Sequence, residues 1–195
     1  MRLYNGPTSP FGRKVAVLYR ELDMEVEEIE IDVYTSEFLD SLNPLRQIPT
    51  LELAGGRAIF DSLVISLYLI DVAGRPDLLP EEGKFEVLTT CALCDGLMEA
   101  VLQRRMESLR PEAERSATVR EKLEQRIGRT VASLAASLDR FSGAQLRLDR
   151  IAAACALEYT SFRFATDWME QHPSLAAWCS AFVNRASFEA TRPKS

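Results

Sequence analysis

The chain has 195 residues, of which 47% are hydrophobic and 27% are charged, with 9 glycines and 9 prolines. This composition is typical of a globular protein with a buried core and excludes a disordered or fibrous chain. The net charge of −6 argues against a nucleic acid partner, which would require a basic surface.

The first 75 residues predict strands that alternate with helices, from apolar spacings of two and of three to four. Gly55 and Gly56 lie between two short apolar segments, which predicts a hairpin because glycine supplies the positive φ angles of a tight turn. The expected order is strand, helix, strand, helix, strand, strand and helix, at residues 2–4, 10–22, 26–33, 36–42, 50–53, 58–60 and 63–74.

The remainder of the chain predicts helices only. Apolar residues recur at spacings of three and four over residues 94–102 and 119–141, and further helices are expected over 151–169 and 173–184. Charge also differs between the two parts, since residues 1–80 carry 7 basic and 13 acidic side chains and residues 81–195 carry 16 of each. We therefore predict an α/β domain followed by an all-α domain, with these bounds: domain 1–76, linker 77–83, domain 84–195.

The loop between the first strand and the first helix is the first candidate site. In the thioredoxin-like fold a Cys-x-x-Cys motif stands there, because the amino terminus of a helix stabilises a thiolate. Here Ser9 and Gly12 occupy the two cysteine positions, which excludes dithiol chemistry at this loop. Ser9 directly before Pro10 is also the pattern of a helix N-cap, so a purely structural role is the alternative.

Two further segments contain candidate binding residues. Pro49 stands directly before a predicted strand, where a cis peptide bond would expose the backbone of Ile48; a trans proline that merely starts the strand is the alternative. Asp61 and Ser62 stand at the start of the next helix, where they could bind a ligand, cap the helix, or do both.

The four cysteines do not predict a metal or disulfide site. Cys91 and Cys94 have a metal-like spacing, but no second Cys or His pair accompanies them, and both fall on an apolar helical stripe. We expect them to be packed in the core. No secretory signal and no run long enough to span a membrane is present, so we expect a cytoplasmic protein with reduced thiols and no membrane partner.

Taken in order, these segments resemble the cytosolic glutathione S-transferase family, and most closely its bacterial members with a serine in the first loop. The resemblance covers nearly the whole chain. Its most specific parts are residues 9–15, 43–51, 61–62, 172–178 and 187–188. It implies a thioredoxin-like N-terminal domain, a helical-bundle C-terminal domain, a homodimer, glutathione as co-substrate and no metal.

The resemblance assigns the reactive role to Ser9, whose hydroxyl would donate a hydrogen bond to the glutathione sulfur. A free thiol has a pKa near 8.5, so little of it is ionised at neutral pH. The expected activity is that of a detoxifying transferase, in which the activated thiol attacks a small electrophile, expected to be apolar, that lies against the helical domain. Met98, Tyr159 and Phe162 are candidates for that second pocket, with core packing as the alternative.

The resemblance also assigns residues that would hold the tripeptide. Ile48 would pair its backbone with the cysteinyl part, with Pro49 cis, and Gln47 would reach the glycyl carboxylate. Asp61 and Ser62 would hold the γ-glutamyl end. An exposed strand-edge backbone suits an extended peptide, and open amides at a helix start suit a carboxylate.

Two alternatives to a transferase stay open. A glutathione transferase-like binding or regulatory protein would keep the fold, and the tripeptide site, without turnover. A glutathione-dependent thiol reductase would normally need a cysteine where Ser9 stands. One departure from the family pattern concerns the helix near Ile151, where Arg147 and Arg150 replace the usual capping residues and Asp149 is the candidate cap instead.

Overall fold

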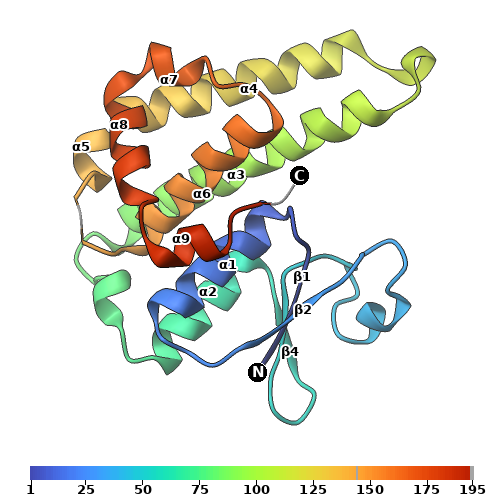
Figure 1. Ribbon diagram of the computed structural model, residues 1–195, viewed down its shortest axis with the longest axis vertical. Helices are drawn as coiled ribbons and strands as arrows, with labels where there is room; N and C mark the ends of the chain where they lie inside the picture. The colour runs from blue at the N-terminus through green and yellow to red at the C-terminus, as the bar shows by residue number, and fades with distance from the viewer. Residues whose placement is uncertain (144, 194–195) are drawn as a thin grey trace. The chain divides into compact units, whose positions relative to one another are not determined.

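The computed structural model describes residues 1–143 and 145–193, and the chain divides into two compact units. The first unit contains residues 1–82 together with the segment that begins at Arg185, and the second unit is Gly83–Asn184. Figure 1 shows the sheet in the first unit and a group of long helices in the second. The predicted division into an α/β part and an all-helical part matches these elements.

The first unit is built on a four-stranded sheet in the order β2-β1-β3-β4. Its strands are β1 (Arg2–Asn5), β2 (Glu27–Glu30), β3 (Thr50–Glu52) and β4 (Ala58–Phe60). β1 runs parallel to β2 and antiparallel to β3, while β3 and β4 form the predicted antiparallel hairpin. Gly55 and Gly56 make its turn with φ angles of 87° and 81°.

Two helices, α1 (Pro10–Glu21) and α2 (Ser62–Val72), pack against each other and cover the sheet (Figure 1). Their inward faces are fully buried, together with the central strands, and form the core of the unit: Leu3, Val15, Val17, Leu18, Leu51, Ile65 and Leu69. The helix predicted over residues 36–42 is a 3₁₀ helix at Glu37–Ser41, and a second 3₁₀ helix spans Pro76–Leu78.

The carboxy-terminal segment corrects the predicted domain bounds. The sequence placed residues up to 195 in the helical domain, but α9 (Ala186–Ala190) belongs to the first unit and packs against α1. The Glu21 carboxylate binds Arg185 at 3.1 Å and accepts a hydrogen bond from Ser187. Arg13 donates to the Phe188 carbonyl at 3.3 Å. These polar contacts, which have no local sequence signal, hold the segment on α1.

The second unit consists of helices around an alanine-rich centre. They are α3 (Lys84–Leu109), α4 (Ala117–Ala136), α5 (Leu138–Phe141), α6 (Leu148–Arg163), α7 (Trp168–Gln171) and α8 (Pro173–Phe182), with a 3₁₀ helix at Glu112–Glu114. Residues 151–157 of α6 have no exposed surface, and their small side chains let α3 pack closely on α6. All four cysteines are buried, which confirms the core packing expected for Cys91 and Cys94.

The start of α6 differs from the sequence expectation, in which Asp149 caps the helix. Asp149 lies inside the first turn, and its carboxylate accepts two hydrogen bonds from Arg147, at 2.8 and 2.7 Å. Arg150 donates to the Phe141 carbonyl at 2.7 Å and to the Gln145 carbonyl. Arg147 also donates to the Arg140 carbonyl at 2.9 Å, so both arginines bind backbone carbonyls that precede α6, and no side-chain N-cap forms.

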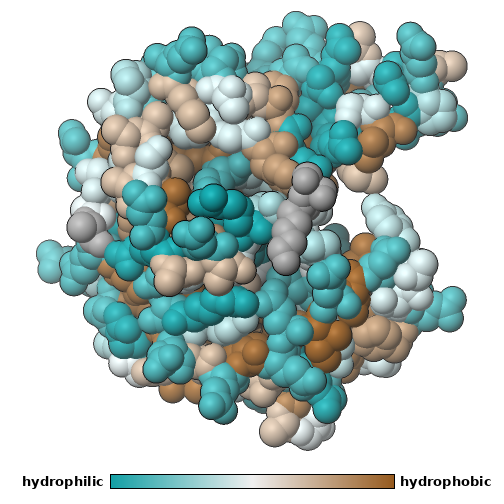
Figure 2. Space-filling view, in the orientation of Figure 1, coloured by the Kyte–Doolittle hydropathy of each residue, from teal (hydrophilic) through white to brown (hydrophobic). Residues whose placement is uncertain are grey.

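The face of the molecule drawn in Figure 2 is predominantly polar. Figure 2 shows hydrophilic residues over most of the face in view, with apolar residues scattered among them. Among the described residues, no helix is long and apolar enough to cross a bilayer.

Candidate functional site

Ser9 stands where β1 has ended and α1 begins. Its φ and ψ of −72° and 119° are those of an N-cap, and its Oγ accepts a hydrogen bond from the Gly12 N–H at 3.1 Å. Pro10 takes the first helical position, as predicted. Among the residues that the structure describes, none accepts the hydrogen of the Ser9 hydroxyl. The capping role is therefore confirmed, and it leaves the hydroxyl free to donate.

Asn5 shapes this loop, and sequence reasoning missed it. Its Oδ1 accepts a hydrogen bond from the Gly6 N–H at 2.8 Å, and its Nδ2 donates to Glu28 Oε1 at 2.9 Å. The carboxamide lies directly on the first turn of α1, because a Cβ atom on Gly12 would be 1.5 Å from Asn5 Oδ1. Glycine at position 12 thus provides the space in which Asn5 fixes the loop that leads to Ser9.

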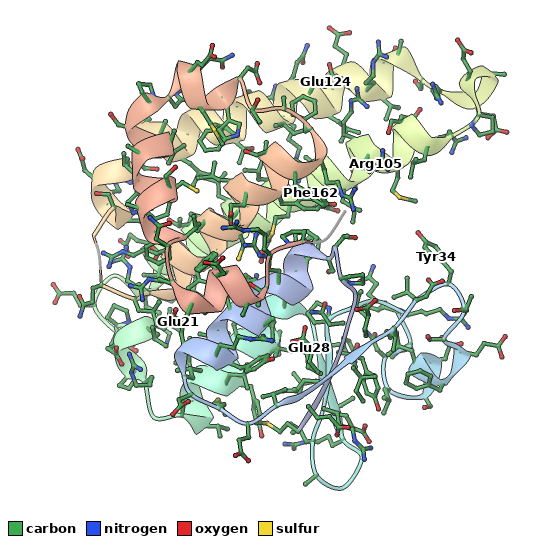
Figure 3. The ribbon with its side chains drawn as sticks, viewed as in Figure 1. Glu21, Glu28, Tyr34, Arg105, Glu124 and Phe162 are labelled. Carbon is green, nitrogen blue, oxygen red and sulfur yellow. The ribbon has the colours of Figure 1, made fainter. Side chains whose placement is uncertain are left out.

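Glu28 anchors Asn5 from β2 and is labelled in Figure 3. Its carboxylate also accepts hydrogen bonds from Tyr19 Oη at 2.9 Å and from Arg20 Nη2 at 3.0 Å. Burial acts to raise the pKa of Glu28, but the hydrogen bonds from Asn5, Tyr19 and Arg20 together outweigh it, so the pKa is lowered. Burial, and secondarily the Glu28 carboxylate, raise the pKa of Tyr19 to about 12. The carboxylate is therefore charged and the phenol neutral at physiological pH.

We expect Glu28→Gln to weaken the acid dependence of stability. Because the folded pKa of Glu28 is lowered, its ionised form contributes stability above the unfolded pKa, about 4.3, and loses it as pH falls through the folded pKa. Urea unfolding between about pH 7 and pH 3 measures this effect. The difference in unfolding free energy between wild type and variant should shrink toward low pH, whereas a constant difference would contradict the assignment.

The Ile48–Pro49 peptide bond is cis, as the sequence suggested. Asn43 Nδ2 and Thr50 Oγ1 both donate to the Gln47 carbonyl, at 2.9 and 2.8 Å, and so hold the chain just before it. Within the described residues, nothing bonds to the backbone N–H or C=O of Ile48. This unpaired backbone can accept an extended peptide as an added strand.

The loops that carry Ile48 and Ser9 meet in the structure. A Cβ atom on Gly6 would lie 2.8 Å from Ile48 Cδ1, so the isoleucine side chain sits directly on the loop between β1 and α1. Gln47 is exposed, and its side-chain amide makes no hydrogen bond with a described residue. The predicted residues of these two segments are therefore brought together.

Asp61 begins α2 with a positive φ of 72° and caps it, since its Oδ1 accepts hydrogen bonds from the N–H groups of Leu63 and Val64 at 2.9 and 3.1 Å. The Asp61 side chain is exposed, whereas Ser62 is 4% exposed. Ser66 donates to the Ser62 carbonyl at 2.6 Å. The Asp61 carboxylate and the Ser62 N–H, for which the described residues provide no acceptor, thus lie together at the start of α2, a suitable place for a group that bears both an ammonium and a carboxylate.

A cavity of about 320 Å³ lies beside Ser9 in the first unit. It is lined by Asn5, Gly6, Pro7, Ser9, Arg13, Ala16, Arg20, Glu28, Glu30, Ala190, Thr191 and Arg192. No other predicted site residue lines it, so Ser9 borders both this cavity and the loop that Ile48 contacts. Its walls are mostly polar, and they include the carboxy-terminal segment, which the sequence predicts to lie in the helical domain. Among the described residues, no cluster of acids, cysteines and histidine could hold a metal ion.

The candidate residues of the second pocket lie in the helical unit. Met98 and Tyr159 are 0% and 3% exposed, so both belong largely to the core, as the alternative interpretation expected. Phe162, near the end of α6, is only partly buried.

Comparison with known proteins agrees with this architecture. The family model "Glutathione S-transferase, N-terminal domain" matches residues 3–77. The Escherichia coli (strain K12) protein described as "Uncharacterized GST-like protein YibF" is 31% identical over 199 residues, which cover 99% of this chain and 98% of that protein.

Solved structures of glutathione S-transferases are also similar to this chain. A glutathione S-transferase from Methylobacillus flagellatus with bound glutathione has 32% identity and a TM-score of 0.93, with 99% of each chain covered. One from Methylobacterium radiotolerans in complex with glutathione sulfonate has 30% identity and a TM-score of 0.92, covering 100% of this chain and 95% of that chain. The fold is thus a thioredoxin-like domain with a helical carboxy-terminal part. The chain belongs to the glutathione S-transferase family.

Proposed function

We propose that this protein is a glutathione S-transferase that activates the glutathione thiol for attack on a small electrophile. The observation that carries the proposal is the hydroxyl of Ser9. It faces a cavity at the start of α1 and caps the helix through its oxygen, and among the described residues no group accepts its hydrogen, which is therefore available to a ligand.

The hydrogen bond from Ser9 and the dipole of α1 can together lower the pKa of the glutathione thiol by the required amount. Lowering a thiol pKa from 8.5 by about two units takes roughly 2.7 kcal/mol of differential stabilisation. A charge-assisted hydrogen bond from Ser9 contributes about 1.5–3 kcal/mol, and the α1 dipole about 0.3–1 kcal/mol. Together they are sufficient to make much of the bound thiol ionised at neutral pH.

The remaining predicted residues would hold the tripeptide. The backbone of Ile48, exposed by the cis bond to Pro49, would pair with the cysteinyl part, and Gln47 would extend to the glycyl carboxylate. Asp61 would bind the γ-glutamyl ammonium, while the amide of Ser62 would face the γ-glutamyl carboxylate. The glutathione-bound relatives support this use of the site.

We further propose a cytoplasmic homodimer with a detoxifying role. Val64 and Val72 on α2 are 49% and 52% exposed, and such apolar side chains suit a contact with a second copy. The family resemblance implies an apolar electrophile. The cavity beside Ser9 is largely polar, however, which favours electrophiles that also carry polar groups.

Glutathione binding and conjugation test the proposal together, with Asp61→Asn as the matched variant. Asparagine caps helices well and accepts a positive φ, so the variant should keep wild-type stability. It loses the charge that would face the ammonium, and we expect glutathione to bind about fivefold more weakly, the effect of an exposed ion pair. Calorimetric titration measures this, with desamino-glutathione as the control ligand whose affinity Asp61→Asn should not change.

Conjugation of 1-chloro-2,4-dinitrobenzene separates the transferase from its alternatives. Wild type should accelerate formation of the thioether above the uncatalysed rate. Binding of glutathione without turnover across a panel of electrophiles would favour a binding or regulatory protein, and disulfide reduction instead of conjugation would favour a thiol reductase. Absence of any heat of binding at millimolar glutathione would contradict the proposed glutathione site itself.

A further inference from the structure

The loop that carries Ser9 is held chiefly by hydrogen bonds. Residues 6–9 are each at least partly exposed, so burial in the core does not fix them. The Ser9 N–H donates to the Gly6 carbonyl at 3.1 Å, which closes the loop into a turn. The position of the Ser9 hydroxyl therefore depends on the position of Gly6.

Gly6 is held in turn by the side chain of Asn5, which is 6% exposed. Among the described residues, the Asn5 carboxamide is the only side chain that hydrogen-bonds to the backbone of residues 6–9, through the Gly6 N–H at 2.8 Å. A continuous series of hydrogen bonds thus runs from Glu28 on β2 through Asn5 and Gly6 to Ser9.

Glu28 determines which way the Asn5 carboxamide faces. An ionised carboxylate can only accept hydrogen bonds, so the Nδ2 of Asn5 must face Glu28, and Oδ1 is left to accept from Gly6. Glu28 lies on the edge strand β2 (Figure 3), and Tyr19 and Arg20 on α1 donate to its carboxylate at 2.9 and 3.0 Å. The anchor of Asn5 is therefore itself fixed from a second element.

We propose that Asn5, anchored by Glu28, is a positioning residue that sets where the Ser9 hydroxyl stands relative to the glutathione sulfur. This inference rests on the proposed transferase function and adds residues that act on the thiol through Ser9. A hydrogen bond weakens steeply as its angle departs from linearity. A loop that loses its hold on Gly6 would therefore lose much of the donation from Ser9.

Asn5→Ala is the principal test, because it removes both hydrogen bonds and leaves Glu28 paired with Tyr19 and Arg20. We expect the pKa of the bound glutathione thiol to rise by about one unit, so that the thiolate and kcat fall about threefold at pH 7 and recover as pH rises. The absorbance of the bound thiolate, titrated against pH, measures this pKa without turnover.

S-methylglutathione is the control ligand, because it has no thiol to ionise. Asn5→Ala should bind it with the affinity of wild type, as measured by calorimetric titration. A loss of affinity for S-methylglutathione as large as the loss for glutathione would overturn the proposal, because Asn5 would then shape the whole site and not the position of the Ser9 hydroxyl.

Tyr4→Phe is the matched control variant. Tyr4 precedes Asn5 on β1, and its Oη donates to Glu52 at 2.8 Å, so the substitution also removes a side-chain hydrogen bond between strands. It does not touch the series that leads to Ser9, and the thiol pKa should stay at the wild-type value. An equal rise in Tyr4→Phe, or an unchanged thiol pKa in Asn5→Ala, would overturn the proposal.

Two variants at position 28 exclude a direct effect of charge, since Glu28 and Ser9 line the same cavity. If the Glu28 charge acted directly on the thiolate, its removal would lower the thiol pKa. Positioning predicts the opposite sign for Glu28→Ala, which loses the anchor of Asn5. Glu28→Gln retains an oxygen that can accept from Asn5 and should keep the thiol pKa near the wild-type value. A lowered thiol pKa in Glu28→Ala would contradict the proposal.

Hydrogen exchange of the Gly12 amide separates this inference from the transferase proposal, because the Gly12 N–H donates to Ser9 Oγ. Without glutathione, exchange at Gly12 should be about fivefold faster in Asn5→Ala and unchanged in Tyr4→Phe. That result in a protein that conjugates no electrophile would support the positioning role while the transferase function fails. Unchanged exchange and an unchanged thiol pKa in a protein that conjugates would overturn the positioning role and leave the transferase intact.

Discussion

Replacing Gly12 by alanine is expected to lower the free energy of unfolding by about 3 kcal/mol and to weaken glutathione binding. The new Cβ would lie 1.5 Å from Asn5 Oδ1, so the carboxamide must move and give up its hydrogen bonds to Gly6 and Glu28. Overpacking of a fixed site costs about 1–3 kcal/mol, and each lost hydrogen bond to a buried partner adds to that cost. Urea unfolding measures the stability. Calorimetric titration measures the affinity for glutathione, which depends on the position of the loop that carries Ser9.

Gly128→Ala provides the matched control for Gly12→Ala. Gly128 also lies inside a helix, α4, but a Cβ there would meet nothing within 4 Å. Alanine should therefore stabilise that position by about 0.5–1 kcal/mol, the ordinary difference in helix propensity. If alanine lowers the free energy of unfolding at position 12 and raises it at position 128, then the space taken by Asn5, and not helix propensity, decides the effect at position 12.

The double variant Asn5→Ala, Gly12→Ala tests the cause directly. Asn5→Ala removes the atoms that the new Cβ would strike, so the second substitution should add little further loss. Additive losses in the double variant, or a Gly12→Ala protein as stable as wild type, would contradict the account of Asn5 as the group that Gly12 accommodates.

Local sequence signals predicted much of the first unit. The Gly55–Gly56 turn, the N-cap at Ser9 with Pro10 behind it, and the cap at Asp61 are each determined by residues within four positions of one another. Such motifs act through backbone geometry that depends little on the rest of the chain. The predicted strand over residues 26–33 shortened to Glu27–Glu30, because pairing with the four residues of β1 limits its length.

Contacts between distant segments could not be predicted in this way. Asn5 reaches Glu28 across 23 positions, and Arg13 reaches Phe188 across 175 positions. Nothing near Asn5 in the sequence indicates that its carboxamide will lie on Gly12. Asp149 shows a different limit, because its partner is local: Arg147, two positions away, binds the carboxylate that was predicted to cap α6. Residues whose side chains form long-range hydrogen bonds do not recur at regular spacings in the sequence. Their partners are therefore known only from the fold.

The structural and the chemical role of Ser9 must be tested separately, because Ser9→Ala removes both a helix cap and a hydrogen-bond donor. We expect the variant to lose about 1 kcal/mol of stability through the cap. We also expect the pKa of the bound glutathione thiol to rise by about one to two units, since a charge-assisted hydrogen bond to the thiolate is lost. A higher thiol pKa means less thiolate, so kcat should fall about 3- to 25-fold at pH 7 and recover as pH rises.

Two further variants at position 9 assign each loss to its cause. Ser9→Asp keeps an oxygen acceptor for the Gly12 N–H and hence the cap, but its carboxylate cannot donate and repels a thiolate. It should be as stable as wild type and as inactive as Ser9→Ala or more so. Ser9→Thr keeps the hydroxyl and should restore most of the activity. The absorbance of the bound thiolate, titrated against pH, measures the thiol pKa without turnover. If Ser9→Asp retains wild-type kcat and an unshifted thiol pKa, then Ser9 serves only as a cap, and the thiolate must be stabilised by the α1 amides alone.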